Sequence, residues 1–477
     1  MAARMRDATV LQSVTDIESA AMNLDKKSLL AWAQDHRADF ESTLQQFVEI
    51  PTVSADPDRV GDIRRCAELA ATKIREFGGE ASILETAGNP IVHGRFDADA
   101  SFPTVTVYNH LDVQPASRET EPWKTEPFTF IKQGDKYLGR GTTDDKGPAL
   151  TALFAIRAAR EAGVRANIHV IWELEEEIGS PNFEAAMKKY RGQLATDSVL
   201  VSDTIWVSRE RPACPAGLRG LQGFELSLET AETDQHSGVV GGAARNPIGE
   251  LMKLVSEMYD ATTGKVKIKG FYDDVLQPSK KELNDFANSG FTVKKFKKDH
   301  GFKSIRTEDP MDVMKRIWAL PTMEVHGLVG GYTGAGIKTV VPPRATVKVS
   351  CRLVPNQNPA KIKKLVREFV KQRNADVKIS FEASMQAYQA PTTGPLADAV
   401  RSAMKFAFGR EPVFVREGGS IGAVVSMEQF LKAPVLFLGL SLPEHGYHAP
   451  NENYDWQQAS GGMVAFVKYF DEIAGMK

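Results

Sequence analysis

Two adjacent aspartates, Asp144 and Asp145, lie in the segment GRGTTDDKG at residues 139–147. Glycine-rich turns precede them, and Lys146 and Gly147 lead into an apolar helical pattern. Ionised carboxylates at the edge of an apolar unit are costly unless a cation accompanies them. The adjacent lysine can offset one charge. Metal ions are indicated if further acids and histidines from distant segments meet at the same place.

Such acids and histidines follow predicted strands along the chain. They are His110, Asp112, Asp144, Glu176, Glu177, Asp203 and His448. Carboxylates and neutral imidazoles are ligands that suit zinc or a similar divalent ion. Asp144, Glu177 and Asp203 together carry three negative charges, which two dications nearly balance and one does not. Because a carboxylate that bridges two ions would hold them close together, the charge count favours a two-metal site.

Each of these residues also has a simpler interpretation. A lone histidine is more often structural than a metal ligand, but Asp112, two residues after His110, can fix the tautomer of that imidazole. The acidic run ELEEEIGS at residues 173–180 has the composition of a solvated loop. The preceding IHVIW is typical of a buried strand, which directs the acids toward the edge of a sheet. Asp203 alone would be weak, because aspartate often ends strands at turns. The set as a whole predicts a metal site.

The elements that must position these residues alternate between strand and helix. We expect strands in TVTVYNHLDVQP (residues 104–115), in ANIHVIWE and in SVLVS, with an apolar helix over 146–163. This alternation predicts an α/β fold with a mostly parallel sheet flanked by helices. Such sheets bind ligands at the carboxyl ends of their strands. His110 and Asp203 would lie at that edge.

Further along the chain the pattern changes to alternating strands, such as GFELSLET and RATVKVSCRLV, mixed with helical patterns such as NPIGELMKLVSEMYD. We predict an inserted α+β domain over residues 217–388. The catalytic domain is then discontinuous and comprises residues 1–216 and 389–477. Within the insertion, residues 261–320 are polar, lysine-rich and weakly patterned, which predicts a solvated, partly irregular arm.

The composition excludes several classes of partner. The 477 residues include 59 Lys and Arg against 61 Asp and Glu, so the net charge of −2 gives no reason to expect nucleic acid or a membrane surface. The three cysteines, Cys66, Cys214 and Cys351, lie far apart, which fits a reducing compartment. The N-terminal segment MAARMRDATVLQSVTDIESA has no signal-peptide core and no apolar span. We therefore expect the cytoplasm.

The motifs resemble those of the di-zinc M20 metallopeptidases, and within them the cytosolic metallodipeptidases of the carnosine-hydrolysing group. The matching motifs are NHLDVQP, GRGTTDDKG, ELEEEIGS, VSDTIW, HSGVVGG, RLVPNQNP, REGGSI and YHAPNE. They occur in the family's order from about residue 105 to 455, so the likeness covers most of the chain. It implies a zinc-exopeptidase-like catalytic domain with an inserted lid and dimerisation domain.

The resemblance implies a role for each site residue. The implied metal ligands are His110 and Asp203 for one zinc ion, Glu177 and His448 for the other, and Asp144 as the bridge between them. Glu176 would be the general base and Asp112 would orient His110. A cis peptide bond is implied between Asp144 and Asp145.

Substrate-binding residues are implied as well. His236 in DQHSG would reach from the partner subunit toward the carbonyl oxygen of the substrate. Arg352 in CRLVP would clamp the substrate carboxylate, a task suited to a bidentate fork. Gly419 and Ser420 would line the carboxylate end.

Two assignments depend on the motif match. His445 lies three residues before His448, and the pattern HAPNE selects the latter. Glu176 and Glu177 are assigned by counting back from the glycine of ELEEEIGS, because Leu174 stands where the family usually has glycine.

The sequence thus predicts a dimeric, dinuclear zinc exopeptidase that hydrolyses dipeptides or short peptides with a free carboxylate, with Mn²⁺ as the other candidate ion. A deacylase or carbamoyl-amide hydrolase of the same fold would keep every metal ligand. An inactive metal-binding scaffold is the alternative from another class. A serine nucleophile is not indicated, because the serines of REGGSI and DQHSG lack a G-x-S-x-G setting.

Overall fold

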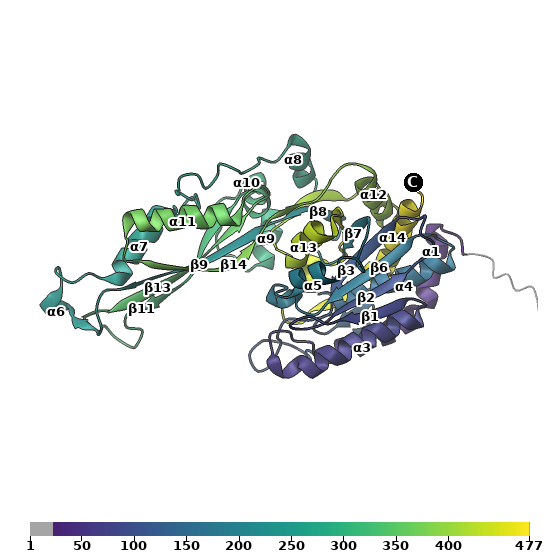
Figure 1. Ribbon diagram of the computed structural model, residues 1–477, viewed down its shortest axis with the longest axis horizontal. Helices are drawn as coiled ribbons and strands as arrows, with labels where there is room; N and C mark the ends of the chain where they lie inside the picture. The colour runs from purple at the N-terminus through teal and green to yellow at the C-terminus, as the bar shows by residue number, and fades with distance from the viewer. Residues whose placement is uncertain (1–21, 477) are drawn as a thin grey trace, which may run out of the picture.

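The computed structural model describes residues 22–476 and divides them into two lobes (Figure 1). The larger lobe contains a six-stranded sheet of order β1-β2-β6-β3-β7-β17. The strands of this sheet are β1 (Glu80–Leu84), β2 (Ile91–Phe96), β3 (Thr104–His110), β6 (Asn167–Glu173), β7 (Ser198–Val201) and β17 (Val435–Phe437). β3, β6, β7 and β17 run parallel; at one edge β2 pairs antiparallel with β6, and β1 pairs antiparallel with β2. The predicted α/β class and mostly parallel sheet are confirmed.

Helices cover both faces of the six-stranded sheet (Figure 1). The helical elements of this lobe are α1 (Lys26–Asp35), α2 (Arg37–Val48), η1 (Pro57–Arg59), α3 (Val60–Glu76), α4 (Lys146–Glu161), η2 (Glu176–Ile178), α5 (Phe183–Tyr190), α12 (Pro395–Phe408), α13 (Gly422–Leu431), η4 (Pro443–His445) and α14 (Trp456–Ala474). Val107 and Val170 share one core with α3, α4 and α14. Tyr108 and Ile171, the next residues along their strands, share a second core with α5 and α13. Because successive side chains of a strand alternate in direction, β3 and β6 are buried on both faces.

The elongated lobe is built on a four-stranded antiparallel sheet of order β11-β13-β9-β14. Its strands are β9 (Gly220–Glu229), β11 (Thr322–Gly330), β13 (Arg344–Leu353) and β14 (Lys378–Met385). The amphipathic helices α7 (Pro247–Met258) and α11 (Pro359–Arg373) share a core with this sheet. The short elements at the tip, β10 (Gln235–His236), α6 (Ser237–Val240) and β12 (Val340–Val341), lie at the end of the lobe farthest from the six-stranded sheet (Figure 1).

Two smaller sheets complete the architecture. One has the order β15-β8-β16 and comprises β8 (Ala213–Leu218), β15 (Tyr388–Gln389) and β16 (Val413–Glu417). The other comprises β4 (Ile131–Gln133), β5 (Lys136–Leu138) and β18 (Asn453–Asp455). Only Arg219 separates β8 from β9, so the chain passes directly from the larger lobe into the elongated one. The domain boundaries at residues 217 and 388 stay a prediction.

The prediction of a solvated arm over residues 261–320 is wrong for part of this segment. It forms α8 (Lys280–Ala287), α9 (Val293–Asp299), α10 (Pro310–Met314) and the π-helical turn η3 (Lys315–Ala319). Phe286 and Trp318 are buried in the main core, with their ring centroids 5.0 Å apart. Glu282 pairs with Arg416 of β16 at 2.7 Å. The burial was missed because these aromatic residues are too widely spaced to form a helical apolar stripe.

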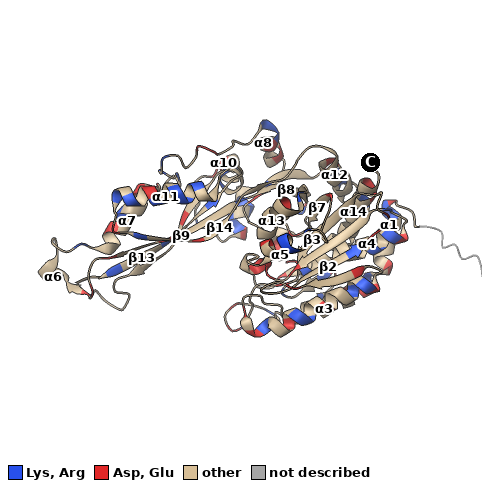
Figure 2. Ribbon diagram, viewed as in Figure 1, with Lys and Arg blue, Asp and Glu red and all other residues tan. Residues whose placement is uncertain are grey.

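Charges of both signs are interspersed along the outer helices α3 and α11 (Figure 2). Among the described residues, no helix combines the length and apolar composition needed to cross a bilayer. The N-terminal segment considered for targeting, residues 1–20, lies entirely outside the described residues.

Candidate metal centre

Asp144 lies between two histidines, His110 and His448, that are far apart in the sequence. Its Oδ1 is 3.0 Å from Nε2 of His110, and its Oδ2 is 3.0 Å from Nε2 of His448. His110 is the last residue of β3, and Asp144 lies in the loop just before α4. The carboxylate therefore presents one oxygen to each imidazole, which is the arrangement that a bridging ligand requires.

Each histidine also has a second acid beside it. Oδ2 of Asp203 lies 3.8 Å from Nε2 of His110. Oε2 of Glu177 lies 3.0 Å from Nε2 of His448. The acids and histidines thus form two sets that share Asp144, and each set contains one histidine and one unshared carboxylate.

Parallel strands bring these residues together. β3, β6 and β7 end side by side, and the chain then turns into segments that carry Glu177 and Asp203. Glu176 belongs to the same place, since it forms a group with His110 and Asp203 whose candidate ligand atoms lie within 4.8 Å of one another. The expected position at the carboxyl edge of the sheet is confirmed by this geometry.

Asp112 holds the turn η2 that carries the two glutamates. Its carboxylate accepts hydrogen bonds from the backbone N–H of Glu176 at 3.1 Å and of Glu177 at 3.0 Å. Its backbone oxygen is 3.0 Å from Nδ1 of His110, and its Oδ1 is 3.5 Å from the same nitrogen. Asp112 is therefore placed to orient the imidazole and the two glutamates together. The side chain of Gln114 donates to Oε2 of Glu177 at 2.7 Å.

Glu452 fixes the loop that carries Asp144. Its buried carboxylate accepts from the backbone N–H groups of Gly141, Thr143 and Asp144 at 2.9–3.1 Å and from Nη1 of Arg140 at 2.8 Å. Four donors to one carboxylate define the loop conformation. The peptide bond between Asp144 and the following aspartate is cis, as the family resemblance implies.

The start of α4 packs closely against this loop. A Cβ atom at Gly147 would lie 2.1 Å from the carbonyl oxygen of Thr142, so only glycine fits there. Lys146 donates to the carbonyl oxygens of Phe47 and Ile50, both at 2.9 Å. The expectation that Lys146 offsets an aspartate charge is therefore not supported, because its ammonium group is bound to these two carbonyl groups instead.

The electrostatics of the cluster fit metal ions. Burial raises the pKa of Glu176 and Asp203. Burial opposes a charge on His110, but the nearby acids, Asp203 first, outweigh it and raise its pKa. Asp144 and then Glu177 raise the pKa of His448 to about 11. The bonds to His110 and His448 lower the pKa of Asp144 against the effect of its burial.

The chemistry of the side chains in the cluster tests whether divalent metal ions fit this site. Oδ2 of Asp144 is buried and has no aligned hydrogen-bond donor among the described residues. Carboxylate oxygens and imidazole nitrogens are ligands that zinc accepts, and a dication would compensate the charges of the acids. The residues present therefore fit two divalent ions.

The positions of the residues agree with the two assignments that depend on the motif match. His445 is buried and bonded to Asp455 at 3.1 Å, whereas His448 lies at the cluster. In the acidic run, Glu173 accepts from Ser180, and Glu175 accepts from the backbone N–H of Asn89. Glu176 and Glu177 are the acids of this run that face the cluster.

The predicted substrate-binding residues lie in two places. Nη1 of Arg352 donates to Oγ of Ser420 at 3.1 Å, and the carbonyl oxygen of Gly419 accepts from the N–H of Arg219 at 3.1 Å. His236 is not brought to this chain's cluster. It is exposed and immediately precedes α6, at the tip of the elongated lobe (Figure 1).

Sequence reasoning missed three residues around the site. Glu452 is the last residue of the motif YHAPNE, but no role was assigned to it. An acid that closely follows an implied metal ligand is a sequence signal for a positioning role. The hydroxyl of Tyr447 donates to Oδ1 of Asp203 at 2.7 Å. Arg219 donates to the carbonyl oxygen of Gly418 at 3.3 Å, and burial together with the charge of Arg352 lowers its pKa to about 10.

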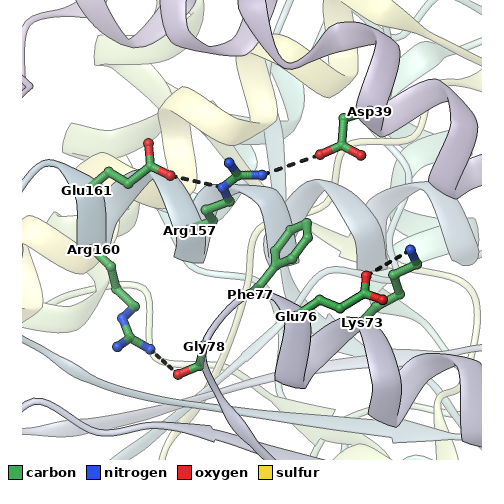
Figure 3. A pocket seen from close by; sticks show the side chains of 8 residues that line it. All are labelled: Asp39, Lys73, Glu76, Phe77, Gly78, Arg157, Arg160 and Glu161. Carbon is green, nitrogen blue, oxygen red and sulfur yellow. Dashed lines mark hydrogen bonds and ion pairs between the residues drawn. The ribbon is translucent and has the colours of Figure 1, made fainter.

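A hollow of about 600 Å³ lies elsewhere, near the C-terminal ends of α3 and α4 (Figure 3). Most of its charges are paired with one another, and Arg160 donates to the carbonyl oxygen of Gly78. Arg157 contacts Asp39 and Glu161, and Lys73 contacts Glu76. With its charges already compensated, this hollow offers no comparable chemistry.

A mostly parallel sheet with paired acids and histidines at its carboxyl edge defines a metal-dependent hydrolase. The model of peptidase family M20/M25/M40 matches residues 106–472, and the chain belongs to this family. Among curated relatives, the Cys-Gly metallodipeptidase of Schizosaccharomyces pombe is 32% identical, over 95% of this chain and 99% of its own. The Beta-Ala-His dipeptidase of Homo sapiens is 27% identical, over 92% and 91%.

Solved structures extend this likeness to the fold. The di-peptidase Dug1p from Saccharomyces cerevisiae superposes with a TM-score of 0.82 at 27% identity, covering 96% of this chain and all of that one. An M20 family metallo-carboxypeptidase from Sulfolobus solfataricus gives a TM-score of 0.83 at 28% identity, covering 91% and 99%. The two lobes of this chain are therefore both part of the shared architecture.

The role of Glu452 can be tested by replacing it with glutamine. Glu452→Gln removes the charge that pairs with buried Arg140 and one acceptor for the loop, so we expect the free energy of unfolding to fall by about 3–5 kcal/mol. Metal affinity should fall about 10- to 100-fold, because the loop carries Asp144. Denaturant unfolding of metal-free protein and metal titration measure the two effects.

The matched control is Glu444→Gln, a change at an exposed acid that pairs with Arg209 on the surface. It should change the unfolding free energy by less than about 1 kcal/mol. Equal unfolding midpoints for the two variants would contradict the role assigned to Glu452.

Proposed function

We propose that this chain is a dinuclear zinc exopeptidase that hydrolyses dipeptides, or short peptides with a free carboxylate. The observation that carries the proposal is the position of Asp144, with one oxygen toward His110 and the other toward His448. The dipeptidase and carboxypeptidase relatives support peptides as the substrate class.

The proposed ligand sets follow from the two clusters. His110 and Asp203 would hold one ion, Glu177 and His448 the other, with Asp144 shared. When bound, two dications would supply the positive charge that lowers the pKa of a nearby water and polarises the scissile carbonyl. Manganese is the other candidate ion.

Glu176 is the proposed general base. It is half-buried beside His110 and Asp203, and it is held by a backbone hydrogen bond to Asp112. From this position it would take a proton from the attacking water and later give it to the leaving amine. Such a role needs a carboxylate whose environment raises its pKa, and burial does so here.

The carboxylate end of the substrate is assigned to Arg352, Ser420 and Gly419. The contact between Arg352 and Ser420 supports this assignment, because a guanidinium and a hydroxyl together offer several donors to one anion. Arg219 adds a second guanidinium, whose pKa is lowered by burial and by the charge of Arg352.

A homodimer is proposed with the elongated lobe as its interface. Met252 of α7 and Leu328 and Val329 of the edge strand β11 expose 58, 47 and 62% of their surfaces. Exposed apolar residues on an edge strand favour pairing with another chain. The remote position of His236 supports its contribution to the partner's site.

The cytoplasm is the proposed location. All three cysteines of the chain are free and buried, which supports a reducing compartment. The proposed domains are residues 1–216 with 389–477 for catalysis and 217–388 for the lid.

The function is tested by hydrolysis of a dipeptide panel, with N-acetyl and N-carbamoyl amino acids alongside. Metal-stripped protein should cleave nothing, and zinc or manganese should restore cleavage of free dipeptides. Cleavage of only the blocked amino acids would move the function to deacylation. With two metals bound and no substrate cleaved, the inactive scaffold would be the better account.

The base is tested by Glu176→Gln, with Glu184→Gln on the exposed face of α5 as control. Because proton transfer by a positioned group contributes typically about 10²- to 10⁴-fold, kcat should fall by about this factor while two metals stay bound. The control should keep the wild-type kcat. An unchanged kcat in the metal-loaded Glu176→Gln variant would show that another group is the base.

A further inference from the structure

Glu417 is a half-buried acid that the proposed catalytic roles leave unused. It is the last residue of β16, and its Oε2 is buried without a hydrogen-bond partner among the described residues. The preceding residue, Arg416, is paired with Glu282 at 2.7 Å. Since successive side chains of a strand point to opposite sides, the Arg416 pair does not compensate the charge of Glu417.

Glu417 lies close to both parts of the proposed active site. Burial, followed by the charges of Asp203 and Asp144, raises its pKa to about 8, so the metal cluster is near enough to influence it. Three residues further along the chain, Ser420 contacts Arg352. The acid is therefore near the metal cluster and near the proposed carboxylate end.

Among the described residues, the nearby guanidinium groups do not form an ion pair with Glu417. Arg352 donates to Ser420, and Arg219 donates to the carbonyl oxygen of Gly418. The two groups of candidate metal ligands among the described residues do not include Glu417. A buried carboxylate with an unpaired oxygen is costly, so a bound molecule that brings a positive charge would be favoured there.

The geometry points to Glu417 as the residue that binds the free ammonium group of a dipeptide substrate and so selects peptides over N-acylated amino acids. This inference rests on the proposed dipeptidase function and deepens it. An ammonium group has three donors and can satisfy both oxygens of a carboxylate. A dipeptide would thus be held at both ends, by Glu417 at its ammonium group and by Arg352 at its carboxylate.

The dimensions agree with this assignment. Three residues of extended chain span at most about 11 Å, which limits the backbone distance between Glu417 and Ser420. The two residues of an extended dipeptide span about 7 Å. The length of one dipeptide is therefore compatible with contact to Glu417 at one end and to the Arg352–Ser420 pair at the other.

The test compares alanyl-glycine with N-acetyl-alanyl-glycine as substrates of the metal-loaded wild type, Glu417→Gln and Glu411→Gln. Glu411 is an exposed acid just before β16 and serves as the matched control. For Glu417→Gln, kcat/KM for the free dipeptide should fall about 10- to 100-fold, the effect of losing one hydrogen bond between charged groups. Most of this change should appear in KM, and hydrolysis of the acetylated substrate should not fall.

The outcomes separate this inference from the proposed function. Suppose that the wild type prefers the free dipeptide and that Glu417→Gln lowers kcat/KM equally for both substrates, or for neither. This result would overturn the role of Glu417 alone. A wild type that cleaves only the acetylated substrate would overturn both the dipeptidase function and ammonium recognition. Thermal unfolding and metal content of each variant identify losses that come from misfolding, and Glu417→Asp, which keeps the charge, should then restore part of the preference.

Discussion

The structure depends on a concentration of buried negative charge at the carboxyl edge of one sheet. Asp112, Asp144 and Asp203 are buried there, and two glutamates join them from η2. The nearest lysine in sequence, Lys146, is bound to backbone carbonyl groups instead. The acids then raise the pKa of both histidines, His110 and His448. Such a cluster is stable at neutral pH only with cations, and divalent ions are the cations that its geometry fits.

The rest of the larger lobe holds this charge in place. Parallel strands bring His110 and the segment of Asp203 to one edge, and α4 starts from the loop of Asp144. Glu452, more than 300 residues further along the chain, binds three backbone N–H groups of that loop and pairs with Arg140. A positioning acid of this kind costs stability unless each of its lone pairs is used, and four donors use them here.

The sequence predicted which acids and histidines the fold brings together, but little of what surrounds them. His110, Asp144 and Asp203 could be found because strand patterns precede them and parallel strands end at one edge. Glu452 and Arg219 were missed because their partners are backbone groups brought near by tertiary folding, which leaves no local pattern. The prediction for the segment that contains Phe286 was wrong for a related reason. Isolated aromatic residues in a polar sequence do not indicate which surface they cover. His236 lies far from the cluster of its own chain, so the role proposed for it requires a second chain.

The most direct measurement is a calorimetric titration of zinc into metal-stripped protein, compared with the Asp144→Asn variant. Two ions per chain should bind to the wild type, with release of protons from the cluster, because the metals replace protons on the histidines and acids. The variant should bind at least one ion more weakly, since it loses the shared carboxylate. A single ion per wild-type chain, or full binding of two ions without Asp144, would contradict the dinuclear account.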